Sequence, residues 1–79
     1  MIAIIDYGVG NLFSLKSSFS YIGEDVTVTD DKNVIHAAHK LILPGVGAFG
    51  DAAKKLRDSG LTEVIQKETS SGKPLLGIC

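Results

Sequence analysis

Residues 41–47 read Leu-Ile-Leu-Pro-Gly-Val-Gly, an apolar run that stops at a proline and two glycines. Proline cannot donate a hydrogen bond to a sheet and glycine favours turns, so the run predicts a short buried strand over 41–43 followed by a tight turn. A second run, Leu-Leu-Gly-Ile at 75–78, predicts another buried strand, and the single cysteine, Cys79, follows it directly. A glycine-rich turn and a thiol therefore each come immediately after a predicted strand.

Further strands are predicted over residues 2–5 and over the β-branched residues 26–29. Helices are expected over residues 12–22, through 34–38, from 52 to 58 and from 61 to 70. The order is then strand, helix, strand, helix, strand, helix, helix, strand. Strands separated by helices pair in parallel, which predicts an α/β fold with an open, mostly parallel sheet and helices on both faces.

The helix boundaries carry capping residues. Asn11 precedes the first helix, Asp30 or Asp31 the second and Asp51 the third, and the oxygens of these side chains suit an N-cap. Gly23 is a natural stop for the first helix. No repeat or linker divides the chain, so residues 1–79 are expected to form a single partial domain.

The bulk composition excludes several classes of partner. The net charge is −1 and 22% of residues are charged, which gives no indication of a nucleic-acid or membrane surface as partner. One cysteine cannot form an internal disulfide, and the N-terminal apolar run is too short for a signal peptide or a membrane span. The expected location is the cytoplasm.

The two turns after the strands suggest nucleophilic chemistry. Ligands of open parallel sheets bind outside the carboxyl ends of the strands. A thiolate at Cys79 that attacks a carboxamide creates an oxyanion, and the flexible backbone of 45–47 can turn N–H groups toward it. Alone, Pro44 and Gly45 would only end a strand, and Cys79 would only be a small core residue. Together they favour an acyl-transfer site.

Three motifs carry a resemblance to a known family. Residues 43–51 (Leu-Pro-Gly-Val-Gly-Ala-Phe-Gly-Asp) and 74–79 (Pro-Leu-Leu-Gly-Ile-Cys) resemble class I, triad-type glutamine amidotransferases. Residues 7–12 (Tyr-Gly-Val-Gly-Asn-Leu) and the Pro-Gly-Val-Gly form of the turn resemble the corresponding motifs of one subfamily. This subfamily contains the glutaminase subunits of imidazole glycerol phosphate synthases, which act in histidine biosynthesis. The resemblance implies the N-terminal part of a flavodoxin-like amidotransferase domain.

The resemblance also implies roles for individual residues. Cys79 would be the nucleophile that forms a thioester with glutamine, the substrate. The backbone of Val46 and Gly47 would form part of the oxyanion hole, and Gly45 and Gly47 would line the glutamine pocket. Ammonia would pass to a synthase (cyclase) subunit as protein partner. No cofactor and no metal are implied.

The first turn is the candidate interface with that partner. It follows the first predicted strand and lies on the same edge of the sheet as Cys79. The residues expected there are Tyr7, Gly8 and Asn11.

The family carries its catalytic His and Glu near the C-terminus, beyond the part that this chain resembles. His36 and His39 precede the third strand and are expected to be two solvated side chains on a short helix. Without a base, the isolated chain is predicted to be inactive and the Cys79 thiol unactivated. Because apolar strands would lack covering elements, the isolated chain is also predicted to self-associate.

Two other interpretations stay open. Gly8 and Gly10 after a strand, with Asp30 about twenty residues on, imitate a dinucleotide-binding fingerprint, although Phe13 occupies the position of its third glycine. Alternatively, the chain is a non-catalytic α/β fragment whose role is interaction alone.

Overall fold

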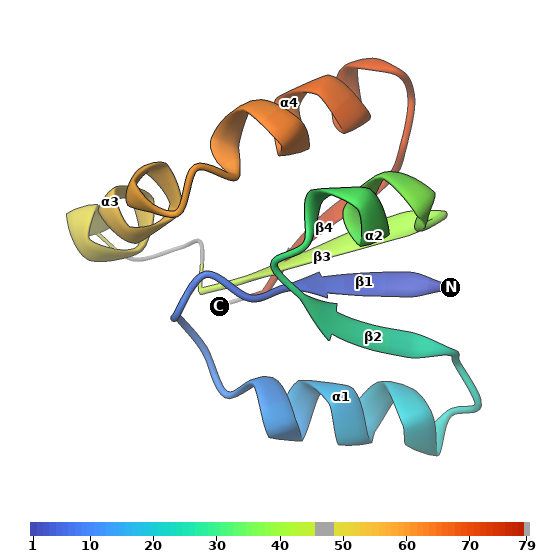
Figure 1. Ribbon diagram of the computed structural model, residues 1–79. Coiled ribbons are helices and arrows are strands. Elements are labelled where there is room, and N and C mark those ends of the chain that lie inside the picture. Colours follow the sequence, from blue (N-terminus) through green and yellow to red (C-terminus); the bar gives the residue numbers. More distant parts are fainter. Residues whose placement is uncertain (46–48, 79) are drawn as a thin grey trace.

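The computed structural model describes residues 1–45 and 49–78, and its central feature is a parallel sheet of four strands (Figure 1). The order across the sheet is β2-β1-β3-β4. The strands are β1 (Ile2–Ile5), β2 (Val26–Thr29), β3 (Lys40–Pro44) and β4 (Leu75–Ile78). The α/β fold predicted from the alternation of strands and helices is therefore confirmed.

The central strand β1 is apolar throughout because both of its faces are covered. It pairs with β2 on one side and with β3 on the other, and all four of its residues are buried. Ala3 and Ile5 belong to the core on one face of the sheet, while Ile2 and Ile4 belong to the core on the opposite face. A strand covered on both faces needs a continuous apolar run rather than an alternating one.

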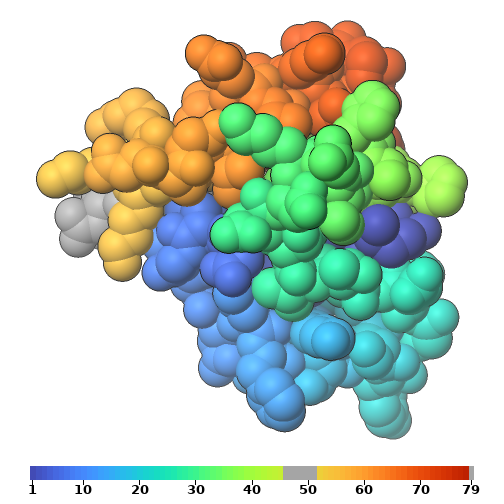
Figure 2. Space-filling model, in the orientation of Figure 1, coloured from blue at the N-terminus to red at the C-terminus, as the bar shows by residue number. Residues whose placement is uncertain are grey.

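The helices form a layer on each face of the sheet. Helix α1 (Leu12–Tyr21) packs Leu12, Leu15 and Phe19 on one core. The other core receives residues from α2, α3 and α4, and Figures 1 and 2 show α2 and α4 on the side of the sheet opposite α1. Their bounds are α2 (Lys32–Ala37), α3 (Phe49–Asp58) and α4 (Thr62–Ser70). None of the helices in 1–45 and 49–78 is long and apolar enough to cross a membrane.

Two of the predicted caps are confirmed and one is wrong. The Asn11 side chain accepts a hydrogen bond from the Ser14 backbone N–H at 3.1 Å, and Asp31 caps α2 in the same way. Helix α3 already begins at Phe49, so Asp51 lies inside the helix. An N-cap must precede the first helical residue, which rules out the expected role of Asp51.

Strand β4 is not buried as predicted. It pairs with β3 and is an edge strand of the described sheet, with Leu75 41% and Leu76 54% exposed. An apolar run predicts the strand correctly, but its burial depends on neighbours in a second layer. Helix α1 contacts β2, at the far edge of the sheet, while Ile78 at the end of β4 is the residue of that strand that packs against the core beneath α1.

A buried carboxylate connects α2, α4 and the loop before β4. Glu68 is only 5% exposed, and its two oxygens lie 2.7 Å from Lys73 Nζ and 2.8 Å from His36 Nδ1. Lys73 Nζ also donates to the carbonyl oxygens of Ile35 and His36. The hydrogen bonds from Lys73 and His36 lower the pKa of Glu68 below its ordinary value.

The expectation of two solvated histidines on one helix is only partly correct. His36 is exposed at the end of α2 but pairs with Glu68. His39 lies beyond the helix, and its Nδ1 is 3.0 Å from the N-terminal amine of Met1. Both contacts join segments more than thirty residues apart, which sequence spacing does not predict.

Replacing Asn11 by alanine should lower the free energy of unfolding by about 1 kcal/mol, because the Ser14 N–H loses its acceptor. Asn11→Asp retains a capping oxygen and should stay close to the parent. Chemical denaturation with helix content followed by circular dichroism measures both. Unchanged stability in Asn11→Ala would contradict the capping role.

Replacing Glu68 by glutamine should change how stability depends on pH. The carboxylate has an ordinary pKa of 4.5, lowered in the fold, so its stabilisation is complete above pH 4.5 and is lost as pH falls through the folded-state pKa. Glu68→Gln should therefore be less stable than the parent at pH 6–7, with the difference shrinking below pH 4.5. Glu63→Gln, an exposed position on the same helix, is the control. Parallel stability curves for the parent and Glu68→Gln would contradict the assignment.

Candidate functional site

The topology places a switch point between the carboxyl ends of β1 and β3. These strands are neighbours, yet the chain leaves β1 toward β2 at one edge and leaves β3 toward β4 at the other. The connecting helices lie on opposite faces, α1 on one and α3 with α4 on the other. Open α/β sheets bind ligands outside the strand ends at such a point.

A buried tyrosine occupies the switch point. Tyr7 follows β1 and is 7% exposed, and its hydroxyl donates a hydrogen bond to the carbonyl oxygen of Pro44 at the end of β3. Burial raises the pKa of the Tyr7 phenol above its ordinary value of 10.0. The hydroxyl therefore remains protonated, and able to donate, at neutral pH.

The end of β3 is also joined to the end of β4. Pro44 pairs with Ile78 in the sheet, and the Gly45 N–H donates to the Ile78 carbonyl oxygen. The start of the glycine-rich turn thus lies beside the residue that precedes Cys79 in the sequence. This arrangement agrees with the expectation that the two strands end side by side.

Two glycines allow the first turn and the end of β3 to pack closely. Gly10 has φ +94°, and a Cβ there would lie 2.9 Å from the Pro44 Cβ. Gly45 has φ +73°, and a Cβ there would collide with the Val9 side chain. Both positions combine a left-handed backbone with no space for a side chain. The Pro44 contact explains the need for Gly10 without a bound nucleotide.

A hollow of about 220 Å³ opens beside these contacts, between the start of α1 and the ends of β3 and β4. Gly45, which sequence reasoning assigned to the glutamine pocket, lines it. The full lining is Gly10, Asn11, Ser14, Leu15, Pro44, Gly45 and Ile78. Across 1–45 and 49–78, no group of three or more His, Cys, Asp or Glu side chains converges in a way that could hold a metal ion.

The predicted site residues divide into two groups. Tyr7, Gly8, Asn11 and Gly45 lie at the carboxyl edge of the sheet, with Tyr7 buried and Gly8 and Asn11 exposed. The proposed nucleophile and oxyanion-hole residues lie outside the described residues; they are Cys79, Val46 and Gly47.

The sequence did not lead us to predict that the Tyr7 hydroxyl points into the protein and donates a hydrogen bond there. The available signal was a tyrosine directly after a buried strand, since a buried phenol normally finds a hydrogen-bond partner. That the partner is the Pro44 carbonyl could not be read from the sequence, because it lies 37 residues away.

Known proteins are similar to this chain over its whole length. No family profile matches the sequence. A curated protein of Methanothermobacter thermautotrophicus, named imidazole glycerol phosphate synthase subunit HisH, is 54% identical over 79 residues, which are 100% of this chain and 39% of the relative. HisH proteins of Syntrophotalea carbinolica and Sulfurimonas denitrificans are 51% and 49% identical over the whole chain, and each is covered to 38%.

The chain therefore spans less than two fifths of the length of these relatives. The match covers their N-terminal part, which agrees with the resemblance seen in the three sequence motifs. From end to end, the chain is homologous to the N-terminal part of the HisH subunit of imidazole glycerol phosphate synthase.

Proposed function

We propose that this chain is the N-terminal part of a glutaminase subunit that supplies ammonia to a synthase partner in histidine biosynthesis. The observation that carries the proposal is the pairing of β3 with β4, which sets Gly45 beside Ile78, the residue before Cys79. A nucleophile and a turn rich in N–H donors need this proximity for acyl transfer. The relatives named as subunits of imidazole glycerol phosphate synthase support the choice of substrate and partner.

In the proposed reaction the Cys79 thiolate attacks the carboxamide carbon of glutamine. The backbone N–H groups of Val46 and Gly47 would stabilise the resulting oxyanion, and the hollow lined by Gly45 would receive part of the substrate. Collapse of the tetrahedral intermediate, with a proton donated to the leaving nitrogen, releases ammonia and leaves a thioester. Water hydrolyses the thioester to glutamate and regenerates the thiol. The proton carrier would belong to the larger part of the subunit, which this chain does not match.

The first turn is the proposed contact with the synthase. Gly8 and Asn11 are exposed at the carboxyl edge, and Asn11 lines the same hollow as Pro44 at the end of β3, so a partner bound there would be near the site of ammonia release. The Tyr7 side chain points inward, so its contribution to such an interface would come from its backbone. The cytoplasm is the proposed location of the assembled enzyme.

A chimera tests the proposal. Residues 1–79 are fused to the part of the Methanothermobacter HisH that lies beyond the matched region, and glutamate release is measured with its synthase partner. The chimera should hydrolyse glutamine, and Cys79→Ala should reduce the rate by about a thousandfold or more. The isolated chain should release no glutamate. A folded but inactive chimera, or turnover by the isolated chain that survives in Cys79→Ala, would contradict the proposal.

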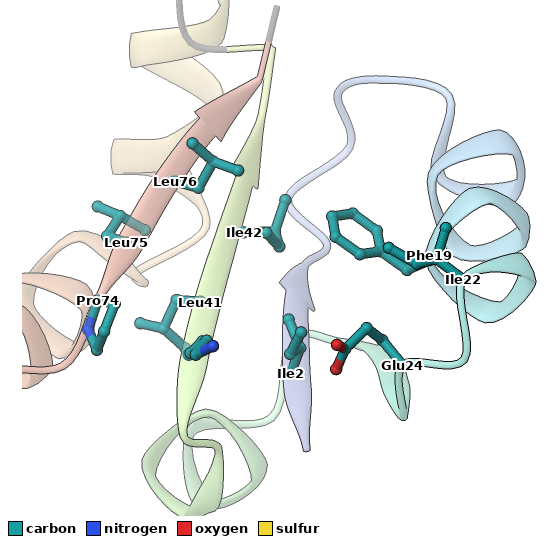
Figure 3. A pocket seen from close by; sticks show the side chains of 10 residues that line it. Ile2, Phe19, Ile22, Glu24, Leu41, Ile42, Pro74, Leu75 and Leu76 are labelled. Atoms are coloured by element: carbon teal, nitrogen blue, oxygen red, sulfur yellow. The ribbon is translucent and has the colours of Figure 1, made fainter.

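The isolated chain is proposed to associate with a second copy of itself through the open face beside β4. An apolar groove of about 290 Å³ lies there, between α1 and the edge strand. Figure 3 shows the side chains that line it. Leu75 and Leu76 lie on its β4 side, and Phe19 and Ile22 on its α1 side. An exposed, apolar edge strand offers unpaired backbone groups to another chain. In the relatives, the remaining three fifths of the subunit is available to cover this face.

Sedimentation of the isolated chain at micromolar concentration should reveal dimers or larger species. Leu76→Lys places a charge on the open edge and should shift the chain toward the 8.3 kDa monomer. Tyr21→Lys makes the same kind of change at a side chain that is 92% exposed and outside the groove, and should leave association unaltered. A compact monomer for the parent chain would contradict the proposed self-association.

A further inference from the structure

We propose that Tyr7 is a positioning residue for glutamine hydrolysis, whose hydroxyl fixes the peptide group from which the oxyanion turn departs. The inference rests on the proposed glutaminase function and adds to it a residue with no direct contact to substrate. Its basis is a chain of hydrogen bonds across the ends of three strands, β1, β3 and β4.

The peptide group between Pro44 and Gly45 is held from both sides. Its carbonyl oxygen belongs to Pro44 and accepts the Tyr7 hydroxyl, while its N–H belongs to Gly45 and donates to Ile78. Because the C=O and N–H of a trans peptide point in opposite directions, these two bonds fix the rotation of the peptide plane. The Ile78 carbonyl itself belongs to the peptide that joins Ile78 to Cys79. One set of hydrogen bonds thus joins the end of β1, the end of β3 and the end of β4.

Such a restraint is needed because the position is a glycine. Gly45 has φ +73° and lacks the steric preference that a side chain gives, so its flanking peptide could otherwise rotate. Packing also limits the backbone conformations open to Gly45, because the Val9 side chain lies against one side of its Cα. The tyrosine ring is packed in the core that includes Ile5 and Leu43, and this packing holds the hydroxyl in place.

The Tyr7 hydroxyl is also chemically suited to act as a constant hydrogen-bond donor to the Pro44 carbonyl oxygen. A buried phenol with a raised pKa stays neutral and keeps its proton for donation across the pH range of an enzyme assay. Removing it leaves the Pro44 carbonyl without its partner in a buried setting. Since oxyanion donors stabilise charge that exists only in the transition state, a turn that starts from a rotated peptide should lower kcat rather than raise KM.

The test uses the chimera described above, with its synthase partner, and the variant Tyr7→Phe. The expected result is a kcat about tenfold lower, equivalent to about 1.4 kcal/mol, with KM within about twofold of the parent. Tyr21→Phe removes the same atom from a fully solvated position and should keep the parental kcat. Ile35→Val, a change in the same core, should lower thermal stability to a similar degree and should also keep the parental kcat.

Amide hydrogen exchange at Gly45 is a second readout that needs no activity. Tyr7→Phe should accelerate exchange of this amide at least several-fold, whereas Ile35→Val should change it only as much as it changes the neighbouring β3 amides. An active chimera in which Tyr7→Phe keeps both the parental kcat and the parental Gly45 exchange would overturn the inference. If the parent chimera is inactive, the proposed function fails, and unaltered Gly45 exchange would independently overturn the positioning role.

Discussion

The parallel pairing of β1 with β3 is the constraint on which the rest of the structure depends. The two strands are central in the sheet and buried on both faces, so helices must cover both sides. Their pairing also sends the chain outward in opposite directions, to β2 at one edge and to β4 at the other. The switch point at their carboxyl ends is a direct result of this arrangement, and no separate element is needed to create it.

The chemistry of the strand ends follows from the same pairing. With the ends of β1 and β3 adjacent, a phenol after one strand reaches a carbonyl at the end of the other. With β3 also paired to β4, the same peptide reaches the residue before Cys79. Glycines at positions 10 and 45 let these backbones approach closely. The core of the sheet and the geometry of the site are therefore stabilised by one set of contacts.

Local features of the fold could be predicted from the sequence, and relations between distant residues could not. The strands and the Asn11 and Asp31 caps depend on a few neighbouring residues, and these predictions are confirmed. The burial of β4 was wrong because apolar composition does not say whether a second layer is present. The partners of Tyr7 and His36 lie more than thirty residues away, where no local rule applies. The roles assigned to Cys79 and the oxyanion turn came from family resemblance and stay predictions.

The strand order has a consequence for how the sheet can assemble during synthesis. A nascent chain is made from its N-terminus, and β1 and β2 are the first strands available to pair. Strand β3 then joins the free side of β1, and β4 joins the free side of β3. Among the four strands within residues 1–45 and 49–78, each adds to an open edge, and none has to be inserted between two strands that are already paired. The sheet can therefore grow in the order in which the ribosome delivers it.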